Sequence, residues 1–182
     1  MPVTQYDIAP LAGPAMWGYL EHARMMRLAT AIGKEPIELS PVWFVVRRQT
    51  IYFPIDPTVG DPGRSTTPAS RHLPALEGGG TLSAVIDDGD ELTNSRGVQL
   101  SGRATKVEQA ALRDELLQLA LEKYFYVGHP HLEHYLSQGV VEARQWFRID
   151  ADRIVGWDRR QLPQAPIMDR RVLPKHLRKR KR

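Results

Sequence analysis

The sequence predicts a mainly β domain of the α+β class, in which short strands form a small barrel with flanking helices. Two observations lead to this prediction. β-rich segments follow one another between residues 27 and 105, separated by turns. One polar, cationic segment, residues 64–72, interrupts the series. A barrel wall beside such a segment is suited to hold an anionic group, which predicts an anion site on the wall.

Length and composition describe an ordinary globular protein. The 182 residues suffice for one domain with appended segments. Cysteine is absent, which excludes disulfides, thiolate metal sites and cysteine nucleophiles. Residues 1–5 lack the pattern of a signal peptide, and no apolar run reaches membrane-spanning length. We therefore expect a cytoplasmic protein without a membrane partner.

The net charge of +4 is unevenly distributed. From Arg159 onward ten basic residues and one acid give +9, so the first 158 residues carry −5. A nucleic-acid-binding surface needs clustered positive charge, which the acidic body does not offer. Only the basic tail, residues 161–182, is suited to bind acidic partners, phosphates or nucleic acid, and a flexible, solvated end is the alternative reading.

The first half of the chain alternates between strand-like runs and turns. An irregular N-terminal arm, residues 1–12, precedes a helix predicted from Pro14 to Met26 by the spacing of its apolar residues. Residues 47–50 suit a hairpin connection, and Pro54 to Pro68 form a loop long enough to favour a functional role. Residues 69–76 predict a short helix, which Gly78 to Gly80 end. The predicted strands are residues 27–32, 40–46, 50–53, 81–87 and 98–107.

The second half contains the clearest helix, from Gln109 to Phe125. Its leucines share one broad face with Lys123 and Tyr124, opposite several acidic and amide side chains. A short helix over residues 132–136 follows. Two further strands, residues 145–149 and 153–157, are predicted on either side of a polar turn at 150–152. The main domain is thus expected over residues 13–160.

The cationic segment is the first candidate site. Arg64, Ser70, Arg71 and His72 bring guanidinium, hydroxyl and imidazole groups to the entrance of the short helix. Such groups, together with free backbone N–H groups, bind phosphate well. The alternative is a solvated loop whose Ser70 or Thr67 merely caps the helix.

Other candidate motifs support specific chemistry less strongly. His129, His131 and His134 could share a metal ion, or simply form a polar helix entrance. The acidic run at residues 87–91 lacks the spacing of a calcium loop, which favours a turn. Trp43 is either a core residue or a strand residue that faces a ligand. No motif of a hydrolase or a nucleoside triphosphatase occurs.

The ordered segments resemble the pyridoxamine 5′-phosphate oxidase-like split-barrel flavoproteins, a superfamily that also includes deazaflavin (coenzyme F-420)-dependent reductases. The resemblance runs from about Trp17 to Trp157. It rests on residues 27–30, 41–44, 51–53, 70–72 with Leu76, 83–88, 97–104 and 153–158. It implies a six-stranded antiparallel split β-barrel that works as a homodimer, with two cofactors at the subunit interface.

The resemblance also implies a function and a set of binding residues. The chain would be an FMN-dependent or F-420-dependent oxidoreductase that moves hydride to or from a small organic substrate. A non-catalytic flavin-binding or haem-binding sensor on the same barrel is the alternative. The family commonly has lysine where this chain has His72, which can still donate a hydrogen bond to phosphate. The implied cofactor-binding residues are Arg27, Ala29, Thr30, Val42, Trp43, Phe53, Arg64, Ser70, Arg71 and His72.

Overall fold

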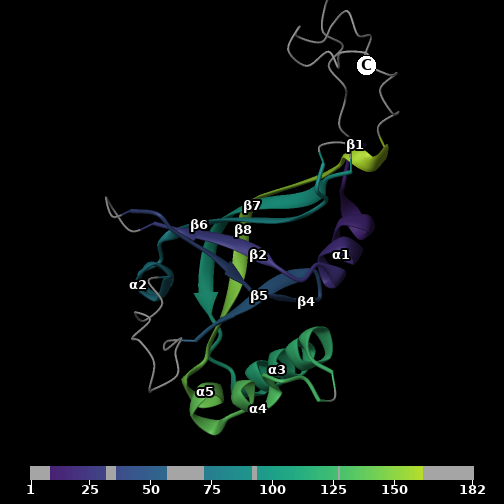
Figure 1. Ribbon diagram of the computed structural model, residues 1–182. Coiled ribbons are helices and arrows are strands. Elements are labelled where there is room, and N and C mark those ends of the chain that lie inside the picture. The colour runs from purple at the N-terminus through teal and green to yellow at the C-terminus, as the bar shows by residue number, and fades with distance from the viewer. Residues whose placement is uncertain (1–8, 32–35, 57–71, 92–93, 127, 162–182) are drawn as a thin grey trace, which may run out of the picture.

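One antiparallel sheet, curled into a half-barrel, forms the body of the protein (Figure 1). The computed structural model describes residues 9–31, 36–56, 72–91, 94–126 and 128–161. The strand order is β3-β2-β6-β7-β8-β5-β4, and β1 pairs with β8. The predicted fold class is thereby confirmed, although the sheet has seven strands along this path where six were expected.

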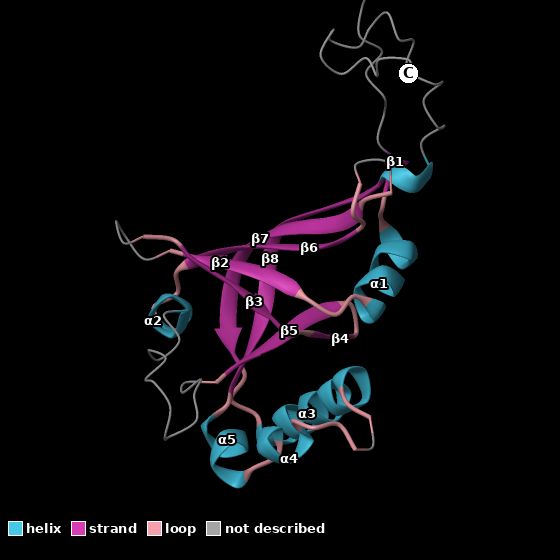
Figure 2. Cartoon of the chain, in the orientation of Figure 1, coloured by secondary structure: helices cyan, strands magenta, loops and turns pink. Residues whose placement is uncertain are grey.

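The strands and helices alternate along the chain. The strands are β1 (Ala9–Pro10), β2 (Met26–Thr30), β3 (Glu38–Val42), β4 (Val45–Arg47), β5 (Thr50–Ile55), β6 (Thr81–Asp88), β7 (Arg96–Lys106) and β8 (Gln145–Asp158). The helices are α1 (Gly13–His22), α2 (His72–Glu77), α3 (Ala110–Tyr124), α4 (Leu132–Tyr135) and α5 (Gln138–Ala143), followed by the 3₁₀ turn η1 (Arg159–Gln161). Figure 2 shows α1 and α2 at opposite ends of the sheet, with α3 to α5 grouped below β4.

The predicted strand over residues 40–46 is divided in two, which corrects the sequence prediction. β3 ends at Val42 and β4 begins at Val45. Between them the buried Phe44 donates its backbone N–H to the Tyr124 hydroxyl at 3.0 Å, and that hydroxyl donates to the Phe44 carbonyl at 2.8 Å. A buried backbone needs partners for both groups, so Tyr124 on α3 replaces the hydrogen bonds that a strand would provide.

The two predicted C-terminal strands are a single strand, β8, which corrects the turn expected at residues 150–152. β7 pairs with β8 along its whole length, with Ser101 opposite Arg153 and Gly102 opposite Ala151. Asp152 is therefore the extra residue of a β-bulge, which bends the sheet without ending the strand. A Cβ atom at Gly102 would lie 2.1 Å from the carbonyl oxygen of Asp150, so this close approach requires glycine.

Helix α1 ends at His22, four residues before the predicted boundary, because Met26 begins β2. The predicted helix at Gln109–Phe125 is confirmed to within one residue at each end, and α5 is an additional helix that the sequence did not indicate. Part of the expected N-terminal arm also belongs to the domain. Ala9–Pro10 pair with β8, and Leu11 is buried in the core.

Two apolar clusters form the core. The larger fills the curled sheet and includes Leu20 of α1, Phe53 of β5 and Phe147 of β8. The smaller lies where α3 packs on β4 and β5, and includes Leu116 and Tyr124. Apolar burial is the main stabilising contribution to folding, so the sheet and α3 are held by separate groups of contacts.

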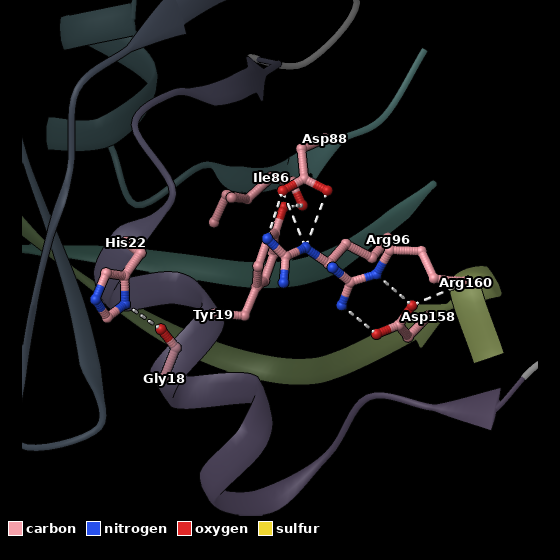
Figure 3. A network of polar contacts seen from close by, with 8 residues as sticks. All are labelled: Gly18, Tyr19, His22, Ile86, Asp88, Arg96, Asp158 and Arg160. Carbon is pink, nitrogen blue, oxygen red and sulfur yellow. Dashed lines mark hydrogen bonds and ion pairs between the residues drawn. The ribbon is translucent and has the colours of Figure 1, made fainter. Parts of the chain in front are cut away.

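A polar network fastens α1 to the ends of the long strands (Figure 3). Tyr19 donates its hydroxyl to the carbonyl of Ile86 at 3.4 Å, and the Arg96 guanidinium lies 4.6 Å from the centroid of the Tyr19 ring. Arg96 also binds Asp88 at 2.9 Å, across β6 and β7. Burial raises the pKa of Tyr19 to about 12. Tyr19 therefore remains a neutral donor at physiological pH.

Candidate cofactor site

Strand β2 presents two different faces to its surroundings. Met26, Leu28 and Thr30 are buried on the core side, whereas Arg27 is exposed and Ala29 is half-buried on the outer side. This alternation is the ordinary geometry of a strand with one covered face. The predicted site residues of this segment are therefore divided: Arg27 and Ala29 share the outer face, and Thr30 points inward.

The structure brings Thr30 and His72 into direct contact. The Thr30 hydroxyl oxygen lies 2.8 Å from Nδ1 of His72, and both side chains are about 3% exposed. Nε2 of His72 is buried and has no hydrogen-bond partner among the described residues. When the Thr30 hydroxyl donates to Nδ1, the ring proton resides on Nε2. This nitrogen is then a buried donor in need of an acceptor.

The position of α2 follows from the turn that ends it. Gly79 has a φ of +69°, which glycine adopts readily. The Gly80 N–H donates to the Ala75 carbonyl at 2.8 Å. A Cβ atom at Gly80 would lie 2.8 Å from that same oxygen and 3.1 Å from the carbonyl oxygen of Ala31. Glycine thus permits the close contact that holds His72 over the end of β2.

Burial controls the charge of His72. Desolvation lowers the pKa of the ring below its ordinary value of 6.5, and the nearby Glu38 carboxylate acts in the opposite direction. A histidine with a lowered pKa is neutral at physiological pH. It can therefore donate one hydrogen bond to an anion, but it adds no positive charge, in contrast to a lysine at this position.

The outer face of β2 and β3 is an open, partly apolar surface. Ala29 pairs with Leu39 across the two strands, and Arg27 pairs with Pro41. Leu39 is 65% exposed and the neighbouring Ile37 is 70% exposed. Arg27 forms an ion pair with Asp87, at the end of β6. A planar, apolar ring with polar edges would find both apolar contact and hydrogen-bonding groups on this face.

The other predicted site residues that the structure describes pack in or against the two core clusters. Val42 packs against the larger core cluster, and Phe53 is fully buried and stacks on Phe147 at 5.7 Å. Trp43 stacks on Tyr124 at 4.7 Å and also contacts the ring of Phe125. These side chains support the wall of the barrel, so their predicted contact with a cofactor stays a prediction.

Three predicted phosphate residues, Arg64, Ser70 and Arg71, lie outside the described residues. Of the histidine cluster, the rings of His129 and His131 are 5.8 Å apart, and His129 packs edge-on against Phe125. Within the described ranges, no group of three or more metal-binding side chains gathers. In the same ranges, no helix combines the length and the apolar character needed to cross a membrane.

Solved structures match this fold over most of its length. The conserved hypothetical protein Rv2991 from Mycobacterium tuberculosis is 22% identical, with a TM-score of 0.64 over 91% of this chain and 96% of that protein. A FAD-binding protein from Mesorhizobium loti is 14% identical, with a TM-score of 0.59 over 82% and 96% of the two chains. A putative pyridoxamine 5′-phosphate oxidase from Listeria innocua is 12% identical, with a TM-score of 0.53 over 76% and 93%.

The chain has the pyridoxamine 5′-phosphate oxidase-like split-barrel fold. The same split barrel occurs in HutZ, a heme storage protein from Vibrio cholerae, at 16% identity and a TM-score of 0.58 over 81% of this chain and 96% of HutZ. The sequence itself matches no family model and no curated protein. At these low identities the likeness establishes the fold, and one fold can hold different ligands.

Sequence reasoning missed one feature of this split barrel, a pocket that contains Lys123 at the junction of α1, β4 and α3. A signal was present, because Lys123 falls on the apolar face of the predicted helix. A lysine among leucines on such a face is either turned back to solvent or partly buried. Only the packing of α3 distinguishes the two cases.

Proposed function

We propose that this split-barrel protein binds a flavin-type cofactor, FMN or the deazaflavin F-420, and transfers hydride to or from a small organic substrate. The observation that carries the proposal is the buried Nε2 of His72, which lacks a hydrogen-bond partner among the described residues. Buried polar atoms are nearly always satisfied, so such an atom points to a missing acceptor. A phosphate oxygen of the cofactor is the acceptor that we assign to it.

Each residue has a separate role in this proposal. Thr30 holds the imidazole of His72 so that Nε2 carries the proton and faces the phosphate. Ala29 and Leu39 offer the apolar outer face of β2 and β3 to the ring, because a small side chain at position 29 permits close approach. Arg27 lies beside Asp87 at the rim of that face, where it can contact a polar edge of the ring. The cofactor, when bound, supplies the hydride chemistry itself.

The proposal includes a homodimer with the cofactor at the interface. Its support is the exposure of Leu39 on β3, the strand at one edge of the sheet, and of Ile37 just before that strand. An exposed apolar edge strand is prone to associate, and a second copy of the chain would cover it. Replacing Leu39 with glutamate should then shift the protein toward monomer in sedimentation experiments, and should weaken cofactor binding at the same time.

Binding is tested by titrating the purified protein with FMN, FAD and F-420 and recording visible absorption and fluorescence. We expect saturable binding of one of these cofactors. His72→Ala should weaken that binding by about ten- to a hundredfold, the range expected for a lost hydrogen bond to a charged group. His131→Ala, at an exposed position near α4, is the matched control and should bind normally. Failure of both FMN and F-420 to bind would overturn the proposal, even if FAD binds.

A non-catalytic haem-binding or flavin-binding sensor is the second candidate function. It is favoured by the structural likeness to the heme storage protein HutZ and by the neutral state of His72, which provides no charge for phosphate. Titration with hemin distinguishes a haem-binding sensor from the proposed oxidoreductase, and turnover of bound flavin by a reductant and an acceptor distinguishes a flavin-binding sensor from it. A Soret band that shifts on binding, together with no response to FMN or F-420, would support the sensor and exclude the oxidoreductase.

A further inference from the structure

The side chain of Lys123, near the C-terminal end of α3, is half-buried. Its ammonium group stands 3.8 Å from the centroid of the Phe44 ring, and Nζ donates a hydrogen bond to the carbonyl of Leu20 at 3.3 Å. The side chain is thus enclosed by α1 on one side and by the segment between β3 and β4 on the other. Contact with an aromatic face partly replaces the hydration that the ammonium group loses.

The amine borders a pocket of about 450 Å³ between the end of α1, strand β4 and the end of α3. Val45, Val46 and Leu119 form its apolar wall, and His22, Arg24 and Lys123 supply basic groups. The volume is within the range of small-molecule sites. In Figure 1 these elements lie away from α2, which carries His72.

The surroundings favour the uncharged amine. Burial and, to a smaller extent, the charge of Arg24 together lower the pKa of Lys123 to about 8, against the opposing effect of Glu21. Glu122 also lines the pocket. An ordinary lysine with a pKa of about 10.4 is less than about 1% uncharged at pH 8, whereas Lys123 is about half uncharged there. Desolvation and a neighbouring cation are the two means by which proteins activate a lysine nucleophile.

We propose that Lys123 is a nucleophilic amine that forms a Schiff base with a small aldehyde bound in this pocket. The nitrogen lone pair attacks the carbonyl carbon, a C–N bond forms, and the C–O π electrons move to the oxygen. A proton passes from the nitrogen to that oxygen, which gives a neutral carbinolamine. A second proton on the hydroxyl lets it leave as water while the nitrogen lone pair forms the C=N bond, and the nitrogen keeps its remaining proton as an iminium. The sequence of steps needs no oxidant or reductant.

His22 lies where its ring can donate the proton needed for the loss of water. Its Nδ1 lies 2.8 Å from the carbonyl oxygen of Gly18, which can only accept, so Nδ1 carries a proton (Figure 3). Nε2 is the remaining site of proton exchange, and the ring lines the same pocket as Lys123. A histidine ring at this position can deliver a proton to a departing hydroxyl group.

The test uses benzaldehyde as the probe. The full-length protein is incubated with benzaldehyde and cyanoborohydride at pH 8, and peptide mass spectrometry measures the rate at which each lysine acquires the reduced adduct. We expect Lys123 to react about tenfold faster than Lys106. The larger uncharged fraction of Lys123 raises its rate, and the weaker nucleophilicity of a less basic amine removes only part of this gain. Lys106 is a suitable comparator because its side chain is 39% exposed and pairs with Glu77.

Two variants and one condition keep the test decisive. Lys123→Arg retains the positive charge and the contact with Phe44, and should abolish the fast adduct without loss of fold. Arg24→Gln should slow the reaction of Lys123, because removal of the neighbouring cation returns its pKa toward the ordinary value. In guanidinium chloride the advantage over Lys106 should disappear. Equal rates for the two lysines in the folded protein, or an advantage that survives unfolding, would overturn the proposal.

Discussion

Thr30 and His72 stand 42 residues apart in the sequence, yet their side chains share a buried hydrogen bond of 2.8 Å. The bond joins the end of β2 to the start of α2, and Nε2 of His72 has no hydrogen-bond partner among the described residues. The contact therefore links the stability of the split barrel to the proposed phosphate site.

Removal of the Thr30 hydroxyl should destabilise the protein. Thr30→Val preserves the shape of the side chain but leaves Nδ1 of His72 buried without a partner. The expected loss in the free energy of unfolding is about 1–3 kcal/mol. Urea denaturation of the cofactor-free protein measures it. Thr105→Val, which removes an exposed hydrogen bond to Asp150, is the control and should cost less. Equal losses of unfolding free energy in the two variants would contradict the prediction that the buried hydrogen bond contributes more than the exposed one.

The neutral state of His72 should make stability depend on pH. Because burial lowers its folded pKa, the unfolded chain binds more protons between that pKa and the unfolded value of 6.5. The contribution of neutral His72 to the free energy of unfolding is fully present above pH 6.5 and is lost as the pH falls through the folded pKa. Denaturation at a series of pH values should show this decline in the wild type. His72→Gln should show a shallower decline, and an unchanged slope would count against the assignment.

The bulge in β8 should tolerate no side chain at Gly102. In Gly102→Ala the new Cβ atom would approach the Asp150 carbonyl oxygen, so we expect a loss of about 1–3 kcal/mol in the free energy of unfolding. Gly18→Ala is the matched control, because a Cβ atom at this position in α1 meets nothing within 4 Å. That change should stabilise the helix by about 0.5–1 kcal/mol. In thermal unfolding, the melting temperature should therefore fall for Gly102→Ala and rise for Gly18→Ala.

The hairpin between β4 and β5 contains backbone strain that a glycine substitution should relieve. Arg48 and Gln49 have φ angles of 48° and 58°, in the left-handed region that favours glycine and asparagine. Gln49→Gly should raise the free energy of unfolding by about 1 kcal/mol, since a non-glycine residue in this region costs about that much. Chemical denaturation provides the value. A decrease would show that the Gln49 side chain contributes contacts that outweigh the strain.

Much of the split barrel could be predicted from local patterns. The leucine spacing of α3 identified that helix, and residues 47–50 were correctly predicted as a hairpin connection. The triple glycine after α2 was correctly interpreted as its end. These features depend on the periodicity and backbone preferences of neighbouring residues, which the sequence displays directly.

The candidate site was predictable only in part. Thr30 and His72 were both predicted as site residues, but for the ring and the phosphate separately, and their contact depends on α2 folding back over β2. Phe53 packs in the core and the half-buried Trp43 packs against it, and the contact of either side chain with a cofactor stays a prediction. Whether an aromatic side chain faces a ligand or the core depends on strand register, which distant partners determine.

The sequence alone determined that this chain is mainly β and that its main helix runs over residues 109–125, within one residue of the observed helix at each end. Only the tertiary structure decided that β8 continues through its bulge, that His72 is buried and neutral, and that Lys123 borders a pocket. The physical reason is the range of the interactions. Helix and turn preferences act within a few residues, whereas burial and desolvation depend on segments brought together by the fold.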